Sequence, residues 1–435
     1  MGYLLREPER GIWYNDSEDE FKCLNLDVIA SQECLSSPSK YRLPVLFWVH
    51  GGSQIISFGN GSSKIGDVWK IARDSVAGDS PIIVVSVQYR LNIFHVGDGT
   101  TNKNLGLKDL QCALEWVHEH IAGFGGDPDQ ITLAGDGAGA VLSHALIVAG
   151  AEVKRAILMS GSLHMSPPQA ENRAQVALVA PILERLQRRG YNSLKTAPVR
   201  ELLEAQQDVP IKSVFLQAEA GLVGWSTKTG KVQELMVGDC QYESSLYRNG
   251  IYELPLRQLF EMFDRAGASA ATLKKLYHIV DGRPWSARLG ALEFLNDMSW
   301  AMQTWKLADR WRREGKTVFT YLFDQENPWQ ASAGAHHAVD LIYLFGGFDL
   351  SHNPAAQKLA TNMRRRFISF VNGDQPWPED LTCAFGPVGQ IAELCEEEVA
   401  CRRRMTAFAV LNSLPPADLK SAFGALIAGR LSFHN

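Results

Sequence analysis

One stretch decides the fold: Thr132-Leu133-Ala134-Gly135-Asp136-Gly137-Ala138-Gly139-Ala140. Residues 131–134 are apolar, which predicts a short buried strand. The glycines at alternating positions predict a tight turn, because glycine adopts backbone angles that other residues avoid. Small and apolar residues continue from 138 to 148 and predict a helix. A strand, a turn and a helix in direct succession are typical of an α/β protein.

The spacing of these glycines matches the turn known as a nucleophile elbow, whose pattern is Gly-x-Ser-x-Gly. That turn presents its central side chain at the top of a sheet, where a substrate can meet it. The central residue here is Gly137, which has no side chain. The stretch is therefore either a chance cluster of glycines or a hydrolase scaffold without its nucleophile.

The composition is that of an ordinary soluble globular protein, with 46% hydrophobic and 21% charged residues. The net charge of −5 argues against nucleic acid or an anionic membrane as a partner. Seven cysteines, an odd number in 435 residues, do not suggest a disulfide framework. None of them belongs to a Cys-x-x-Cys pair, so we expect no zinc site.

The sequence shows no pattern for export, membrane insertion or cofactor binding. Residues 1–15 lack an apolar signal core, and no stretch stays apolar for about 18 residues. We therefore expect a cytoplasmic protein with mostly reduced thiols. Because no Gly-rich dinucleotide motif, P-loop or metal-ligand cluster is present, we expect no cofactor and no metal.

Strands and helices are expected to alternate along the chain. Continuous apolar runs predict buried parallel strands, at 44–49, 82–87, 155–159, 234–238 and 317–323. Helical patterns are clearest at 107–121, 354–371 and 420–431. This alternation predicts a mostly parallel central sheet flanked by helices. We expect 1–435 to form a single domain, with helical insertions at about 165–232 and 250–315 that cap the carboxyl edge of the sheet.

Four features directly follow predicted strands: the loop His50-Gly51-Gly52-Ser53, the turn at Gly137, Glu243 and His337. The carboxyl ends of parallel strands meet at one edge of a sheet, where ligand sites form. Each feature alone is weak evidence, because most loop residues of these types are structural. Their order along the chain, a glycine loop, an elbow, an acid and a histidine, is that of the α/β-hydrolases.

The sequence resembles the type-B carboxylesterases, a family that includes cholinesterases and many fungal esterases and lipases. The resemblance covers roughly residues 17–380, and the stretch at 20–26 is similar to a motif of fungal members. The matching motifs are Asn104-Leu105-Gly106-Leu107, Gly123-Phe124-Gly125-Gly126-Asp127-Pro128, Met159-Ser160-Gly161-Ser162, Val237-Gly238-Asp239-Cys240-Gln241-Tyr242-Glu243 and Gly334-Ala335-His336-His337.

The resemblance implies a role for each site residue. Glu243 and His337 correspond to the acid and base of a catalytic triad, and the register selects His337 over His336. The oxyanion hole would consist of the backbone N–H groups of Gly52, Ser53 and Ala138. The remaining pocket residues implied are Gly51, Asp136 and Ser160; Ser160 would either hydrogen-bond on the Glu243 side, as its counterpart in the family does, or serve only as a turn residue.

The departures from the family pattern matter as much as the match. The serine nucleophile is replaced by Gly137, and the third glycine of the oxyanion loop is Ser53. The family's first several dozen residues have no counterpart here, and Cys23 lacks the upstream cysteine that secreted members pair with it. These features suggest a shortened N-terminus and a more open pocket.

Three interpretations of Gly137 stay open. The first, which we favour, is a non-hydrolytic enzyme for cyclisation, elimination or isomerisation, in which His337 and Glu243 form the acid/base pair. The second is a carboxylic ester hydrolase whose serine was deliberately exchanged for glycine. The third is a binding protein without catalysis.

The substrate class follows only from what the site lacks. An apolar gorge without a charge clamp suggests a neutral organic molecule, and the fungal resemblance makes a secondary-metabolite intermediate a candidate. An oligomer is possible, but the sequence does not indicate one. Ser53 and Cys240 are conceivable surrogate nucleophiles, but we interpret them as a turn residue and a half-buried thiol.

Overall fold

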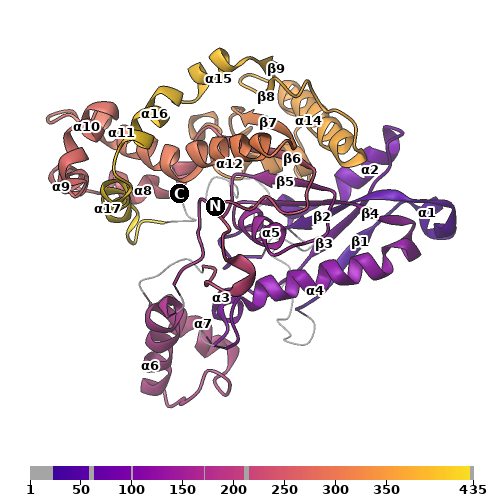
Figure 1. Ribbon diagram of the computed structural model, residues 1–435, viewed down its shortest axis with the longest axis horizontal. Helices are drawn as coiled ribbons and strands as arrows, with labels where there is room; N and C mark the ends of the chain where they lie inside the picture. Colours follow the sequence, from indigo (N-terminus) through magenta and orange to yellow (C-terminus); the bar gives the residue numbers. More distant parts are fainter. Residues whose placement is uncertain (1–22, 58–62, 99–100, 171, 210–214, 432–435) are drawn as a thin grey trace.

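A computed structural model describes residues 23–57, 63–98, 101–170, 172–209 and 215–431 (Figure 1). Its centre is a nine-stranded sheet with the strand order β1-β3-β2-β4-β5-β6-β7-β8-β9. The strands from β3 to β8 pair in parallel, whereas β1 and β9 join the two edges antiparallel. This is the predicted fold class, an α/β-hydrolase fold with a mostly parallel sheet.

The strands are β1 (Leu26–Ile29), β2 (Leu43–Val49), β3 (Ile83–Val87), β4 (Gly126–Asp136), β5 (Arg155–Met159), β6 (Glu234–Cys240), β7 (Thr317–Phe323), β8 (Thr382–Phe385) and β9 (Ile391–Leu394). The register places Phe47 of β2 opposite Val85 of β3 and Leu133 of β4. The exits of β2, β4, β5, β6 and β7 therefore lie along one edge of the sheet.

The helices that flank the sheet are α2 (Trp69–Ala77), α4 (Leu105–His120), α5 (Ala138–Val148), α12 (Met302–Arg313), α13 (Val339–Phe345) and α14 (Pro354–Asn372). The others are α1 (Gln32–Ser36), α3 (Asn92–Val96), α6 (Ala180–Arg188), α7 (Val199–Gln207), α8 (Arg248–Tyr252), α9 (Leu256–Asp264), α10 (Ala270–Leu276), α11 (Pro284–Asn296), α15 (Glu396–Arg402), α16 (Met405–Ser413) and α17 (Pro416–Ile427). No helix in the described part of the chain is long and apolar enough to cross a membrane.

The sheet is buried on both faces because its strands carry apolar side chains on both sides. Val45, Phe47 and Val49 of β2 pack with α4, α5 and α12. Leu46 and Trp48 point the opposite way and pack with α2, α13 and α14, as the two-residue repeat of a strand requires. Burial on both faces explains why these strands appear in the sequence as continuous apolar runs.

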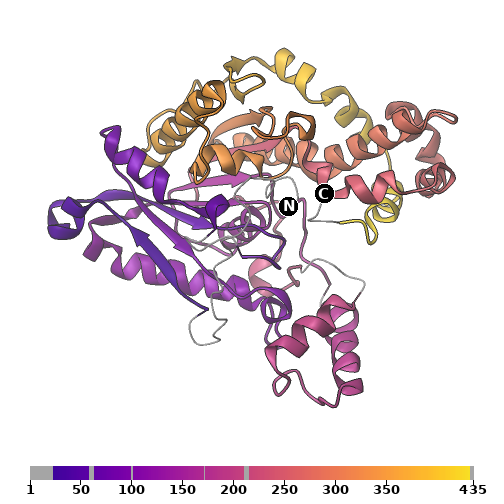
Figure 2. The same ribbon diagram turned by 180° about the vertical axis from the view of Figure 1, so that it is seen from behind.

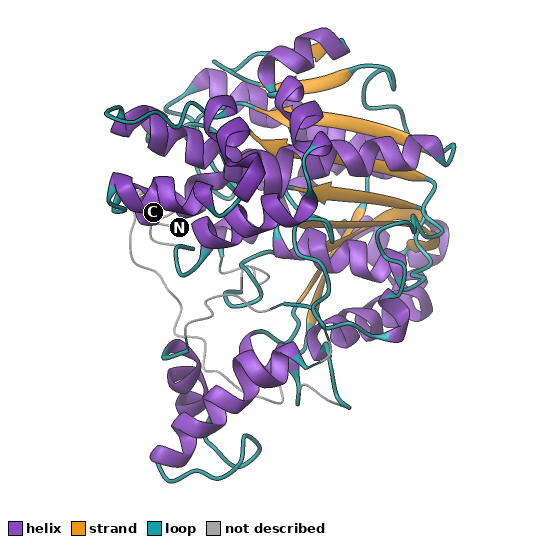
Figure 3. Ribbon diagram, turned by 60° about the vertical axis from the view of Figure 1, so that its left-hand side comes forward, coloured by secondary structure: helices purple, strands orange, loops and turns teal. Residues whose placement is uncertain are grey.

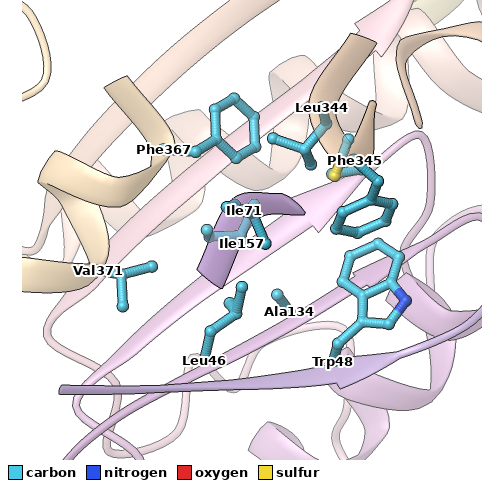
Figure 4. Close-up of a pocket in the computed structure, with 10 residues that line it drawn as sticks. Leu46, Trp48, Ile71, Ala134, Ile157, Leu344, Phe345, Phe367 and Val371 are labelled. Atoms are coloured by element: carbon cyan, nitrogen blue, oxygen red, sulfur yellow. The ribbon is translucent and has the colours of Figure 1, made fainter. Parts of the chain in front are cut away.

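A small void lies in the packing between the sheet and α2, α13 and α14 (Figure 4). Its volume is about 10 Å³, the lower limit for a single water molecule. The residues around it are apolar, and none belongs to the predicted site: Leu46, Trp48, Ile71, Ala134, Ile157, Met159, Leu344, Phe345, Phe367 and Val371. The void is therefore a packing defect of the core, too small for a substrate.

Two groups of helices leave the sheet. The pair α6 and α7 projects away from it below α3 (Figure 1, Figure 2 and Figure 3). It shares a separate apolar cluster with α3, which includes Ile93, Leu186 and Leu202. Helices α8 to α11 form another cluster with α16 and α17. In contrast, α12 lies within the second predicted insertion but packs on the sheet through Leu307 and Trp311.

Consecutive arginines attach the C-terminal helices to the sheet. Buried Arg403 donates from Nε to Asp239 Oδ1 at 2.8 Å, and from Nη1 to Asp324 Oδ1 at 2.8 Å. These carboxylates lie near the exits of β6 and β7, so one guanidinium bridges the two neighbouring strands. Arg404 donates from Nη2 to Asp297 Oδ1 at 2.7 Å. The pairing matters because isolated buried charges are strongly destabilising.

Candidate active site

The turn between β4 and α5 has the geometry of a nucleophile elbow. Gly137 has φ 52° and ψ −114°, a combination that side chains with a Cβ rarely adopt. Its N–H donates to Met159 O at 2.9 Å, and its carbonyl accepts from Val141 N–H at 3.1 Å. The turn is thereby fixed to β5 on one side and to the first turn of α5 on the other.

The neighbouring glycines are required by close backbone packing. A Cβ on Gly139 would lie 2.1 Å from Val49 O, and a Cβ on Gly135 would lie 2.5 Å from the carbonyl carbon of Gly139. A Cβ on Gly161 would lie 2.2 Å from Gly137 O. At Gly137 itself, a Cβ would meet only a side chain, His337 Nε2 at 3.1 Å. A side chain at the central position needs a small shift of His337, whereas the other positions admit none.

An acid and an imidazole meet beside this turn. His337 Nδ1 lies 2.5 Å from Glu243 Oε2, and Glu243 Oε1 accepts the N–H of Cys240 at 2.7 Å. Glu243 is fully buried, while the side chain of His337 is 18% exposed. The loops that carry them are joined because Tyr242 N–H donates to Ala335 O at 2.9 Å. The free ring nitrogen of His337 therefore faces the position above Gly137.

Two further buried carboxyls surround the imidazole. Burial raises the pKa of Asp136 to about 7, with a further increase from Glu243 and an opposing decrease from His337. Burial and the neighbouring carboxylates also raise the pKa of Asp340 well above its usual range. Burial lowers the pKa of His337, but Glu243, Asp136 and Asp340 raise it to about 9. His337 therefore carries a proton at neutral pH.

Asp340 is a site residue that sequence reasoning missed. It lies three residues after His337, at the start of α13, and its Oδ1 accepts the N–H of Leu341 at 3.1 Å. Asp136 Oδ1 has no hydrogen-bond partner among the described residues, whereas a hydrogen bond with the side chain of Cys240 partly offsets the raised pKa of Asp340. The spacing from His337 was visible in the sequence, but the depth of burial that makes Asp340 important was not.

Trp300 also belongs to the site. Its ring centroid lies 6.1 Å from that of His337, and its indole N–H is buried without a partner in the described chain. A π-helix at Asp297–Ala301, between α11 and α12, places it there. The sequence shows Trp300 only as an aromatic residue in a helical region, which is usually a core position.

The loop after β2 carries the predicted oxyanion donors. Gly52, Ser53 and Gln54 all have positive φ, at 103°, 54° and 60°. Gly51 is forced by packing, since a Cβ there would lie 2.7 Å from Asp136 O. Among the described residues, no acceptor is found for the N–H of Gly52 or Ser53. The same holds for Ala138, the first residue of α5, as suits groups that receive a ligand.

Other expected contacts differ from the structure. Ser160 lies at the exit of β5 with φ 51°, but its buried Oγ has no partner among the described residues and does not bond Glu243. His336 points elsewhere, with Nε2 3.0 Å from Asn327 Nδ2. Burial raises the pKa of Cys240 well above its usual range, so a thiolate nucleophile is disfavoured there. Within the described residues, no group of His, Cys, Asp and Glu is arranged to hold a metal.

A parallel sheet with a glycine elbow after β4, a buried acid after β6 and an imidazole after β7 is the framework of an α/β-hydrolase. The order along the chain agrees with this class. A sequence profile of the carboxylesterase family matches residues 6–391. The chain therefore belongs to the carboxylesterase family.

Individual relatives agree with this assignment. Lipase 1 of Yarrowia lipolytica is 28% identical over 377 residues, covering 83% of this chain and 73% of its own. A carboxylesterase of Geobacillus stearothermophilus shares the fold with a TM-score of 0.68 and 23% identity, covering 87% of this chain and 85% of its own. The inactive carboxylesterase-like protein VdtD of Byssochlamys spectabilis is 36% identical over 155 residues, or 34% of this chain and 25% of its own.

Proposed function

We propose that this protein is an acid/base enzyme that converts a neutral, carbonyl-bearing small molecule without an acyl-enzyme intermediate. One observation carries the proposal: His337 keeps its 2.5 Å contact with Glu243, while its Nε2 faces the side-chain-free Gly137. A serine nucleophile would normally occupy that position. Its absence leaves room for a substrate atom directly beside the imidazole.

The chemistry follows from the protonation state of His337. With a pKa of about 9, the imidazolium donates a proton at neutral pH and becomes a base as the pH rises past that value. A substrate carbonyl in the loop at Gly52 and Ser53 would be polarised by backbone N–H groups. In its neutral form His337 would take the proton whose removal gives an enolate or phenolate, and as the imidazolium it would return that proton at a new position. Isomerisation, elimination or ring closure by this route requires no serine.

Acyl transfer by the usual route does not fit the chain. Loss of the serine nucleophile from a serine protease lowers kcat by about 10⁶, and glycine offers no substitute. The favoured interpretation is supported by the retained pair of Glu243 and His337, and a relative named as an inactive carboxylesterase-like protein is consistent only with the absence of ester hydrolysis. We therefore place this protein among the members that keep the scaffold but abandon acylation, with a secondary-metabolite intermediate as the substrate class.

Ester hydrolysis is the second candidate, in a protein whose serine was exchanged for glycine. It is favoured by the elbow geometry of Gly137, and by a Cβ position that meets only the side chain of His337, at 3.1 Å, so that a serine needs only a small shift of that side chain. Relatives named as lipases are consistent with it.

The deciding experiment restores the missing group. Gly137→Ser, Gly137→Ala as a control without hydroxyl, and the double variant Gly137→Ser/His337→Gln are treated with a fluorophosphonate probe and p-nitrophenyl esters. We expect labelling of Gly137→Ser alone, and faster labelling as the pH rises towards 9, because the neutral imidazole of His337 and the oxyanion loop would activate the new hydroxyl. No labelling of Gly137→Ser would show that the pair or the loop is not competent, and the proposal would fail. Ester turnover by the unaltered protein that His337→Gln abolishes would favour hydrolysis instead.

A further inference from the structure

The oxyanion loop has backbone angles that are unfavourable for its residues, and hydrogen bonds from outside the loop maintain them. Ser53 and Gln54 have φ of 54° and 60°, in the left-handed region that residues with a Cβ avoid. Within the loop, the N–H groups of Ile55 and Ile56 both donate to Gly52 O at 3.0 Å. These local bonds leave the carbonyls of Gln54 and Ile55 for partners outside the loop.

Asn92, the first residue of α3, supplies those partners. Its backbone N–H donates to Gln54 O at 2.7 Å, and its side-chain Nδ2 donates to Ile55 O at 3.1 Å. Asn92 itself has φ 57°, which asparagine tolerates better than most residues. One residue therefore binds two consecutive carbonyls of the oxyanion loop.

Gln206 of α7 fixes Asn92 in turn. Its Nε2 donates to Asn92 Oδ1 at 3.2 Å, and its Oε1 accepts the N–H of Ile93 at 2.8 Å. The side chain of Gln206 is only 9% exposed, so water competes weakly for these bonds. Ile55 also packs against the apolar cluster of α3, α6 and α7. The projecting helix pair thus contacts the loop by hydrogen bonds and by packing.

We propose that Gln206 and Asn92 are positioning residues, through which the α6–α7 pair holds the backbone of Ser53 and Gln54 in its left-handed conformation. The N–H groups of Gly52 and Ser53 are thereby kept in place for a substrate oxygen. Their use as oxyanion donors rests on the proposed function, but the coupling of α7 to the loop does not. The coupling matters more here than in a loop with a third glycine, because the left-handed conformation is unfavourable for Ser53.

Amide hydrogen exchange tests the coupling without any substrate. The variants are Gln206→Leu, Asn92→Gly, which keeps the permitted φ but removes the side chain, and the control Gln187→Leu at an exposed position of α6. We expect the Ile55 and Ile56 amides to exchange at least 10-fold faster in the first two variants, with β2 and β4 unchanged. Unchanged exchange at Ile55 and Ile56 would overturn the inference. Equal acceleration throughout β2 and β4 would also overturn it, since Gln206 would then merely stabilise the fold.

A rescue experiment tests the positioning of the donors. In a Gly137→Ser background, Gln206→Leu should slow fluorophosphonate labelling at least 10-fold, and Ser53→Gly should recover most of that loss because glycine accepts the left-handed backbone unaided. The Gln187→Leu control should label at the parent rate. A loss that Ser53→Gly does not relieve would overturn the positioning role. If the parent Gly137→Ser protein does not label, the proposed function fails, and the exchange experiment still decides the coupling.

Discussion

The two halves of the candidate site have diverged differently from the family pattern. The acid/base half, after β6 and β7, keeps every expected contact: Glu243 binds both the imidazole of His337 and the N–H of Cys240. The nucleophile half, after β2 and β4, keeps its backbone geometry but has Gly137 at the reactive position and Ser53 in the donor loop. The backbone frame of the elbow is thus set by packing and does not depend on a side chain at position 137.

The largest effect is expected from a substitution that disturbs the backbone packing around the elbow. In Gly139→Ala the new Cβ would lie 2.1 Å from Val49 O, so α5 must move away from β2. We expect a loss of at least about 4 kcal/mol in the free energy of unfolding, the range of severe packing defects. Gly123→Ala is the control, because nothing lies within 4 Å of its Cβ position. Urea denaturation of both variants measures the difference, and equal stabilities would contradict the packing argument.

The acid/base half makes a prediction about pH. Because the pKa of His337 is raised to about 9 from 6.5, its protonated form stabilises the folded state. That contribution is fully present below pH 6.5 and is lost as the pH rises through 9. Relative to His337→Gln, the unaltered protein should therefore lose up to about 3 kcal/mol of stability between pH 6 and pH 9.5. Urea denaturation at intermediate pH values checks this, and a difference independent of pH would disprove the raised pKa.

A smaller effect is expected at the centre of the elbow. Gly137→Ala places a Cβ at φ 52° and 3.1 Å from His337 Nε2. We expect a cost of about 1–3 kcal/mol, the usual range for strained backbone. Gly137→Ser should cost a similar amount, since the strain arises from the Cβ. Thermal or urea unfolding of both variants measures this cost. A cost as large as that of Gly139→Ala would contradict the distinction between the centre of the elbow and its tightly packed neighbours.

The smallest expected effect is the electrostatic influence of the nucleophile half on the pKa of His337 in the acid/base half. The carboxyl of Asp136, beside Gly137, contributes to the raised pKa of His337. Asp136→Asn should therefore lower that pKa from about 9, which an NMR titration of the imidazole would show. The exposed Asp349→Asn serves as the control and should leave the pKa unchanged. An unchanged pKa in Asp136→Asn would show that the halves are electrostatically independent.

The sequence predicted the parallel core well because buried strands are continuous apolar runs. The bounds of the strands predicted at 317–323 and 155–159 coincide with those of β7 and β5. The edge strands β8 and β9 were not predicted, because they are short and their antiparallel pairing depends on residues far apart in the chain. Helix α17 was placed at 420–431 but spans Pro416–Ile427, since an initial proline starts the helix earlier.

Site residues that can be identified from their order along the chain were predictable. Site residues whose role depends on burial were less so. The structure brings together Gly137, Glu243 and His337, which the sequence identified by their positions after strands. Asp340 was missed, and Trp300, a candidate for lining an aromatic gorge, was interpreted as more typical of a core position, because only the fold shows that both lie close to the imidazole. For Ser160 the sequence left a contact with Glu243 and a turn role open, and its hydroxyl has no partner among the described residues, because the direction of one hydroxyl cannot be deduced from a motif.

The link from Arg403 to the exits of β6 and β7 bears on the order in which the site forms during synthesis. The strands that frame the elbow, β2, β4 and β5, have all been synthesised by residue 161, well before most of the chain. The other half contains Asp239, Asp324 and Asp297, whose partners Arg403 and Arg404 follow more than 60 residues after His337. Newly made chains would therefore pass through a stage in which the strands of the elbow are complete and these carboxylates still lack their arginine partners.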